Sequence, residues 1–396
     1  MRVLVLSFYY PPDIGPGPLR AESIVQALRE KDKNISIDVI TTMPNRYSSL
    51  NIDCDETHQD LNSSVKRISL PKHNSGMKNQ AYAFYFFARG VFKAIKKQKY
   101  DLVLATSSRL MTAFLGALIA KRAGAKLYLD IRDLFTDTMK DVLINSPMKL
   151  LLPIFKYVEK WTFKSASMIN IVSGGFVQHI KAIAPSIELT IYTNGVDDVF
   201  VNTDFSSEKN HVPKILYAGN LGEGQGLDNV IPNVAKSLGG EVVFVIFGDG
   251  GKRKELETKI EAARLTNVTL SPPIEREQLF EEYKNADILF LHLNDYAAFK
   301  KVLPSKIFEY AATGKPIVAG VGGYAAKFIR ENIPGATVFQ PNNEEHMISA
   351  IKTSLKSENM FDRDEFLKRY IRKNIMRKMA EDIYDLGLRS KHNFLN

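Results

Sequence analysis

Lys306 and Glu309 are the two residues whose types and spacing best suit the binding of a nucleotide. They lie three residues apart, just after Pro304-Ser305, where a helix is expected to begin, so both should project from one helix face. Free N–H groups at the start of a helix bind phosphate, and a nearby lysine would neutralise a diphosphate. A carboxylate one turn further along could accept hydrogen bonds from both ribose hydroxyls. An ordinary surface ion pair would have the same spacing, and the sequence leaves both interpretations open.

Several nucleotide-binding and metal-binding signatures are absent from the chain. Glycine-rich loops follow predicted strands at 219–226 and 248–251, but neither is an intact dinucleotide fingerprint followed by a ribose-binding acid. There is no Walker A or His-Glu-x-x-His motif, the seven histidines are scattered, and Cys54 is the single cysteine. These absences argue against a nicotinamide dehydrogenase, a disulfide scaffold and a cysteine-rich zinc site. We therefore expect no metal site.

The elements around these residues follow one repeated pattern. Short apolar segments alternate with helical ones from residue 3 to 192, and the alternation restarts at residue 214, which predicts two α/β domains with parallel sheets. We expect domains at 1–195 and 196–370, with a helical tail at 371–396 that returns to the first domain. Because ligands of such sheets bind beyond the carboxyl ends of strands, the cleft between two facing domains is the expected site.

Charge is concentrated in one segment. The chain has 396 residues and a formal net charge of +9, and residues 61–100 hold nine basic residues and no acidic one. Such a run predicts an anionic partner, either a membrane surface, a phosphorylated lipid or a nucleic acid. The longest apolar run, 110–120, is too short to span a bilayer. We expect a cytoplasmic protein that is at most peripheral to a membrane.

Residues 78–100 combine this charge with aromatic side chains. If the segment is helical, Phe84 and Phe87 share a face, and Lys93, Lys96 and Lys97 crowd its carboxyl-terminal half. This arrangement suits an interfacial helix that inserts aromatics beside anionic lipid headgroups. A helix that packs its aromatic face into the core would show the same pattern.

Four segments in a common order resemble retaining glycosyltransferases of family 4, which have the GT-B fold. The segment 304–318 is similar to the second half of their Glu-x7-Glu region. Residues 9–20, 129–134 and 217–227 resemble the branch that builds bacterial O-antigen and capsule, which includes fucosamine transferases. The resemblance covers nearly the whole chain and implies α/β architecture with two facing Rossmann-like domains.

The resemblance implies roles for individual residues on the donor side. Glu309 would hold the donor ribose, and Ser305 and Lys306 its diphosphate. Asn220 and Gln225 occupy positions where many relatives have an arginine and a lysine, and Lys301 replaces the first glutamate of the Glu-x7-Glu region. The start of the nucleotide-binding domain would further include Gly219, Gly248 and Asp249.

The resemblance also implies roles in the first domain. Arg132 and Asp133 lie where relatives place a catalytic-site histidine, and Asp133 would orient the acceptor hydroxyl or accept its proton. A strand-end residue that caps the next helix is the alternative. Gly15 and Gly17 would let the backbone approach phosphates, and Arg20 would add a charge there unless it is simply exposed on its helix.

The implied activity is retaining transfer of a sugar from a UDP-sugar, such as UDP-FucNAc, to a polyprenyl-diphosphate-linked glycan. The donor is a co-substrate, so no cofactor and no metal are expected, and departing phosphate oxygens would help to deprotonate the acceptor. A nucleotide-sugar epimerase of similar architecture is the alternative enzyme. A basic nucleic-acid-binding protein is a weaker alternative because no motif supports it, and we expect no nucleic acid as partner.

Overall fold

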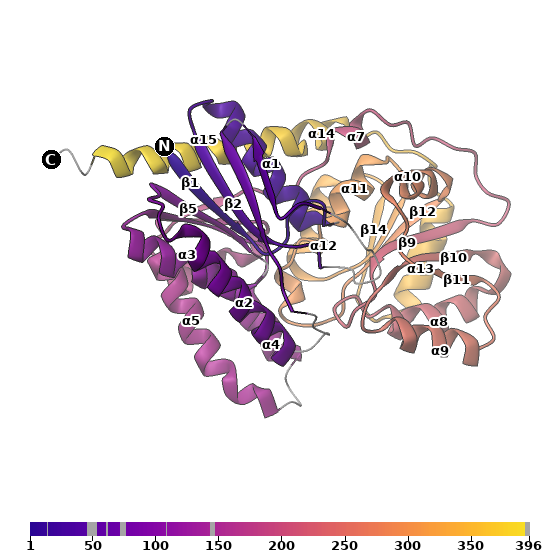
Figure 1. Cartoon of the computed structure of the whole chain (residues 1–396). Coiled ribbons are helices and arrows are strands. Elements are labelled where there is room, and N and C mark those ends of the chain that lie inside the picture. Colours follow the sequence, from indigo (N-terminus) through magenta and orange to yellow (C-terminus); the bar gives the residue numbers. More distant parts are fainter. Residues whose placement is uncertain are drawn as a thin grey trace. The chain divides into compact units, whose positions relative to one another are not determined.

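The computed structural model describes residues 1–13, 15–45, 54–60, 62–71, 77–107, 109–142 and 147–392. The chain divides into two compact units (Figure 1). Unit 1 contains residues 1–194 and 372–396, and unit 2 contains residues 195–371. Part of the basic run, 72–76, lies outside the described residues.

Unit 1 is built on an eight-stranded sheet with the order β3-β4-β2-β1-β5-β6-β7-β8. Its neighbouring strands are parallel except for the antiparallel pair of β3 and β4. The inner strands are almost continuously apolar because helices cover both faces of a parallel sheet. The strands are β1 (Arg2–Ser7), β2 (Ser36–Thr42), β3 (Thr57–Asp60), β4 (Ser63–Ile68), β5 (Leu102–Ser107), β6 (Lys126–Ile131), β7 (Met168–Ile171) and β8 (Glu188–Ile191).

In Figure 1, α1 and α15 lie on one face of this sheet, and α2, α3 and α5 lie on the other. The helical segments are α1 (Pro16–Lys31), α2 (Met77–Ile95), α3 (Leu110–Ala123), α4 (Phe135–Val142), η1 (Pro147–Leu151), α5 (Leu152–Ser165), η2 (Gly174–Phe176), α6 (Val177–Ile183) and α15 (Arg372–His392). The contact of α15 with α1 confirms that the carboxyl-terminal helix returns to the first unit.

Unit 2 has a six-stranded sheet with the order β11-β10-β9-β12-β13-β14, and all its neighbouring strands are parallel. Its strands are β9 (Lys214–Asn220), β10 (Val243–Asp249), β11 (Val268–Ser271), β12 (Ile288–His292), β13 (Ile317–Gly320) and β14 (Ala336–Phe339). Its helical segments are α7 (Asp198–Val201), α8 (Leu227–Leu238), η3 (Gly239–Glu241), α9 (Arg253–Ala262), α10 (Arg276–Asn285), η4 (Phe299–Lys301), α11 (Lys306–Ala312), α12 (Gly323–Asn332), α13 (Glu344–Leu355) and α14 (Asp364–Tyr370). The α/β prediction of two Rossmann-like domains is confirmed.

Two features of unit 1 differ from the expectation. The hairpin of β3 and β4 was not predicted, because β3 is polar and largely exposed and so lacks an apolar pattern. The prediction that Phe87 inserts into a membrane is wrong. Phe87 is fully buried, and its ring meets that of Phe8 edge-on with centroids 5.2 Å apart.

The burial of Phe87 decides how the other predicted membrane-patch residues of α2 are exposed. Phe84 is half-buried, and its ring centroid lies 6.2 Å from that of Phe87, so the shared face of α2 serves the core. Lys93, Lys96 and Lys97 are exposed, the last two just beyond the helix end. The charged part of the predicted membrane patch is therefore on the surface, whereas its aromatic part is wholly buried at Phe87 and only partly exposed at Phe84.

Candidate functional site

The residues predicted to bind the donor gather at one edge of the unit 2 sheet. β9 lies between β10 and β12, so the chain leaves β9 and β12 in opposite directions across the sheet. Such a point of reversal is where open α/β sheets bind ligands. The loop 221–226 follows β9, the segment 293–305 follows β12, and Gly248 and Asp249 pair with Gly219 and Asn220 where β10 ends.

Lys306 lies directly against Gly219. A Cβ atom placed on Gly219 would come within 2.3 Å of Lys306 Cε and Nζ, and Gly219 has a φ of +154° that other residues rarely adopt. Lys306 Nζ also lies 5.7 Å from the centroid of the Tyr217 ring. Because Gly219 has no side chain, the ammonium group of Lys306 can lie against its Cα at the end of β9.

Glu309 follows one turn after Lys306 on α11. Its carboxylate is half-buried, and Oε2 accepts a hydrogen bond of 3.3 Å from the hydroxyl of the fully buried Tyr283. Ser305 precedes the helix, and its side chain makes no capping hydrogen bond. The other end of α11 is fixed by buried Arg363, which donates to the carbonyl oxygens of Tyr310 and Ala311 at 3.2 and 3.1 Å.

The side chains of Asn220 and Gln225 bond to each other at the two ends of the loop that follows β9. Asn220 Nδ2 donates to Gln225 Oε1 at 2.7 Å, and the same oxygen accepts from the Gly222 amide at 3.2 Å. Asp249 is exposed and accepts from the Gly250 amide at 2.8 Å. Neither Asn220 nor Gln225 carries a charge, so in this loop they shape the backbone and do not neutralise an anion.

His292 is a buried residue of this edge to which the sequence reasoning assigned no role. Nδ1 donates to the Gln225 carbonyl oxygen at 2.6 Å, and Nε2 accepts from the Asn342 amide at 3.2 Å. This pattern requires the neutral ring, and burial lowers the pKa of His292 to about 4. His292 therefore fixes the loop 222–226 to the end of β12 through the Gln225 carbonyl group.

The residues predicted in unit 1 gather at the corresponding edge of its own sheet. β1 lies between β2 and β5, so the chain reverses its direction of travel there as well. A Cβ atom on Gly17 would lie 2.4 Å from Arg132 Nη1, so the guanidinium of Arg132 packs on the first turn of α1. Gly15 caps this helix with a φ of +139°. The structure thus brings the Gly15/Gly17 loop and Arg132 together.

Asp133 follows Arg132 and precedes α4. Burial raises the pKa of Asp133 to about 6, although hydrogen bonds from the Leu134 amide and the Thr138 hydroxyl and the charge of Arg132 oppose this shift. Thr138 Oγ1 lies 3.4 Å from Asp133 Oδ1. A carboxyl group that titrates near neutral pH can accept a proton from a substrate hydroxyl.

Arg20 does not have the predicted role. Its side chain is fully buried and pairs with the equally buried Asp130, to which Nε and Nη2 each donate at 2.8 Å. Nη1 donates to the Thr193 carbonyl oxygen at 2.7 Å. Neither a phosphate-binding role nor an exposed position is compatible with this burial, so Arg20 is a structural residue.

Arg109 is a candidate that sequence reasoning missed. It lies just after β5, its guanidinium carbon is 4.3 Å from the Phe8 ring centroid, and Nη2 donates to the Tyr9 hydroxyl at 2.6 Å. No carboxylate within ion-pair distance of Arg109 is found in the described part of the chain. Its only signal in the sequence is a basic residue immediately after an apolar strand.

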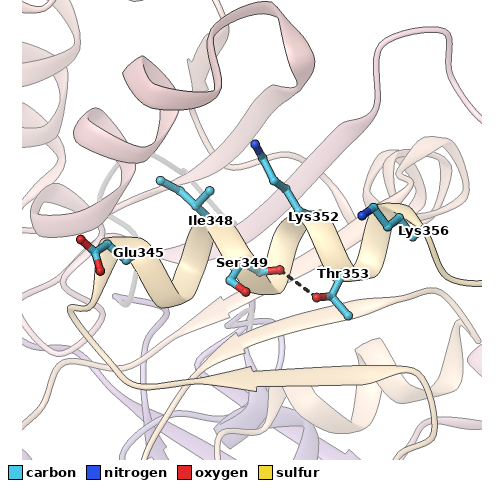
Figure 2. Close-up of a pocket in the computed structure, with 6 residues that line it drawn as sticks. All are labelled: Glu345, Ile348, Ser349, Lys352, Thr353 and Lys356. Carbon is cyan, nitrogen blue, oxygen red and sulfur yellow. Dashed lines mark hydrogen bonds between the residues drawn. The ribbon is translucent and has the colours of Figure 1, made fainter.

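One surface hollow lies apart from these two edges. Figure 2 shows a hollow lined from one helix, α13, by Glu345, Ile348, Ser349, Lys352, Thr353 and Lys356. It contains none of the predicted site residues, and Lys352 pairs there with Glu241 at 3.8 Å. Within the described ranges, no group of three or more His, Cys, Asp or Glu side chains could hold a metal ion.

The chain is similar to known glycosyltransferases. Residues 201–374 match the family model described as glycosyl transferases group 1. A protein of Escherichia coli K12, described as the colanic acid biosynthesis glycosyl transferase WcaI, is 25% identical over 413 residues, which cover 97% of this chain and 100% of that protein.

Solved structures of other proteins share the fold, and two examples follow. Sucrose-phosphate synthase from Thermosynechococcus elongatus superposes with a TM-score of 0.72 at 12% identity, covering 99% of this chain and 98% of that one. HepE from Anabaena, in complex with UDP-glucose, superposes with a TM-score of 0.62 at 14% identity, covering 100% and 99%. The chain therefore carries a glycosyltransferase group 1 domain in a GT-B fold of two Rossmann-like units, and it is a glycosyltransferase.

Proposed function

We propose that this glycosyltransferase transfers a sugar from a UDP-sugar, held by unit 2, to a lipid-linked glycan, held by unit 1, with retention of configuration. The observation that carries the proposal is the placement of Lys306 on Gly219, one helical turn from Glu309, where the chain reverses direction in the unit 2 sheet. The complex of HepE with UDP-glucose supports UDP as the nucleotide.

On the donor side, Lys306 would neutralise the diphosphate, and Glu309 would accept hydrogen bonds from the ribose hydroxyls. Because Asn220 and Gln225 bond to each other and carry no charge, Lys306 would supply the principal positive charge. The leaving group is then stabilised electrostatically without a required metal. Transfer that persists in EDTA is the result expected from this arrangement.

On the acceptor side, Arg109 and Arg132 offer two guanidinium groups to an anionic acceptor such as a polyprenyl-diphosphate-linked glycan. Arginine is suited to phosphate because its planar fork can donate two parallel hydrogen bonds. The similarity to WcaI supports a polysaccharide product, and we propose O-antigen or capsule synthesis with an N-acetylated amino sugar such as FucNAc as donor sugar. The enzyme would then work at the cytoplasmic face of a membrane.

Neither the epimerase nor the nucleic-acid-binding alternative is retained, because residues 201–374 match glycosyl transferases.

Asp133 predicts the pH dependence of this reaction. If its carboxylate accepts the acceptor proton, kcat/KM should rise with pH through about 6, because the carboxyl group is protonated and inactive as a base below that pKa. Asp133→Asn should lower kcat about 10²- to 10⁴-fold and abolish this limb of the profile. A variant that keeps the wild-type profile would assign proton acceptance to another group, such as a departing phosphate oxygen.

The proposal is tested by incubating the protein with radiolabelled UDP-sugars and polyprenyl-diphosphate sugars. We expect lipid-linked product and a rise in melting temperature with UDP that is larger than with GDP. Glu309→Ala should weaken UDP binding and also lower the melting temperature without ligand slightly, because the hydroxyl of buried Tyr283 loses its acceptor. The rise in melting temperature with UDP, taken from each variant's own unliganded value, is therefore the readout. Glu257→Ala, which alters an exposed glutamate on α9, should bind UDP like the wild type. Absence of both transfer and UDP-dependent stabilisation would refute the proposal.

A further inference from the structure

A row of large apolar side chains is exposed on one helical segment of unit 1. Leu150 in η1 is 84% exposed, and Ile154 and Tyr157 in α5 are 58% and 71% exposed. Exposed apolar residues are common singly, but several that adjoin one another indicate a surface for interaction. η1 ends at Leu151 and α5 begins at Leu152, and the helical backbone angles of Leu151 let the two segments run on without a break.

These side chains lie on the same side of the helix. At about 100° per residue, positions 154, 157 and 161 of α5 fall within a sector of about 60°. Leu150 lies one turn before Ile154, in η1. Trp161 continues the row, half-exposed, with its ring centroid 5.3 Å from that of Phe114. We call Leu150, Ile154, Tyr157 and Trp161 the α5 stripe. The opposite side of α5 packs inward through Leu152, Thr162 and Phe163, which are buried. The α5 stripe therefore faces outward, except at its carboxyl-terminal end, where the Trp161 ring also contacts Phe114 of α3.

Positive charge flanks the α5 stripe. Four lysines of this segment are exposed, namely Lys149, Lys156, Lys160 and Lys164. Its one acidic residue, Glu159, is buried, accepts from Thr136 Oγ1 at 2.7 Å and pairs with His179 Nε2 at 3.0 Å. The exposed side of residues 147–165 therefore carries four positive charges and no negative one.

We propose that the α5 stripe and its four lysines dock unit 1 on an anionic lipid bilayer. Leucine, isoleucine and aromatic side chains would enter the boundary between headgroups and acyl chains, while the lysines remain among the headgroups. Because its exposed apolar side chains share one side and its lysines flank them, this segment would lie along the membrane surface. Among the helices the structure describes, none is long and apolar enough to cross a membrane. A second copy of the chain is a poorer occupant, because its four lysines would face these four.

This surface differs from the membrane patch expected from the sequence. On α2, Tyr82 and Tyr85 are exposed by 53% and 58%, but Phe87 is committed to the core. The biological reason for docking rests on the proposed function, in which the acceptor is linked to a membrane lipid. The evidence for docking is the exposure of the α5 stripe and the charge of its four lysines.

Sedimentation of the full chain with phosphatidylcholine vesicles, with and without phosphatidylglycerol, tests the inference. We expect binding only to the anionic vesicles, weakened by salt. The variant Ile154→Ser/Tyr157→Ser should lower the partition coefficient at least tenfold. Lys156→Gln/Lys160→Gln should lower it about fivefold for each lysine. Val199→Ser/Val201→Ser, which removes two exposed valines of α7 in unit 2, should bind as the wild type does.

Unchanged binding by both α5 variants would overturn the inference, as would a loss of binding confined to Tyr82→Ser/Tyr85→Ser. A dimer that dissociates when the α5 stripe is altered, without vesicle binding by the wild type, would also overturn it in favour of a second copy. The vesicle assay contains neither donor nor acceptor, so a failure of the docking inference can be told apart from a failure of the proposed function. UDP-dependent stabilisation of each variant reports on that function independently.

Discussion

Lys306→Gln is expected to lower kcat/KM for sugar transfer by about two to three orders of magnitude, the usual cost of removing one donor that stabilises charge in a transition state. The leaving UDP gains negative charge as the bond to the sugar breaks. In unit 2, the ammonium of Lys306 stands at the end of β9, and the nearby Asn220 and Gln225 are uncharged. No nearby side chain in that loop would therefore replace its charge.

The matched control is Lys300→Gln. Lys300 belongs to the same segment after β12, but its ammonium is exposed and pairs with Asp295 at 3.1 Å. Steady-state kinetics with a UDP-sugar should show a change of less than about fivefold for this variant, as for most exposed ion pairs. Gly219→Ala should reproduce the Lys306 defect, because the added Cβ would occupy the place of Lys306 Cε. Wild-type kcat/KM in Lys306→Gln would remove this lysine from the mechanism.

Asp130→Ala is expected to destabilise unit 1 by about 3–5 kcal/mol, because it leaves the Arg20 guanidinium buried without its counter-charge. Arg20 and Asp130 are both fully buried. Asp130 also accepts hydrogen bonds from Thr106 Oγ1 at 2.8 Å and Asn170 Nδ2 at 2.7 Å. These contacts join α1, β5, β6 and β7, so one substitution weakens the contacts among several elements.

The measurement is urea unfolding followed by tryptophan fluorescence, since Trp161 is the single tryptophan and lies in unit 1. Arg2→Gln is the control: its partner Asp38 is at 2.8 Å, but Arg2 is partly exposed, so a loss of no more than about 1 kcal/mol is expected. In Arg20→Met/Asp130→Leu, much of the loss should be recovered, because no buried charge remains. A loss below 1 kcal/mol for Asp130→Ala would contradict the structural role assigned to this pair.

The fold could be predicted largely from local pattern. Buried parallel strands must be apolar throughout, and loops that turn tightly at strand ends need glycine. Strands such as 102–106 and 214–217 and the loop 219–226 are therefore visible in the sequence. The spacing of Lys306 and Glu309 also foretold their shared helix. His292 could not be predicted in the same way, because its partners, the Gln225 carbonyl and the Asn342 amide, are backbone groups distant in sequence.

Sequence alone therefore determined the two α/β units, the strand ends that carry Arg132 and Gly219, the glycine loop that leads into the first helix at Gly17, and the excess of positive charge at residues 61–100. Only the tertiary structure decided which side of each helix is covered. Arg20 and Phe87 became buried because β6 and Phe8 lie against them, whereas Ile154 and Tyr157 remained exposed because α5 turns its other side inward. The periodicity of a helix shows that its sides differ, but which side is buried depends on neighbours that the chain brings from far away.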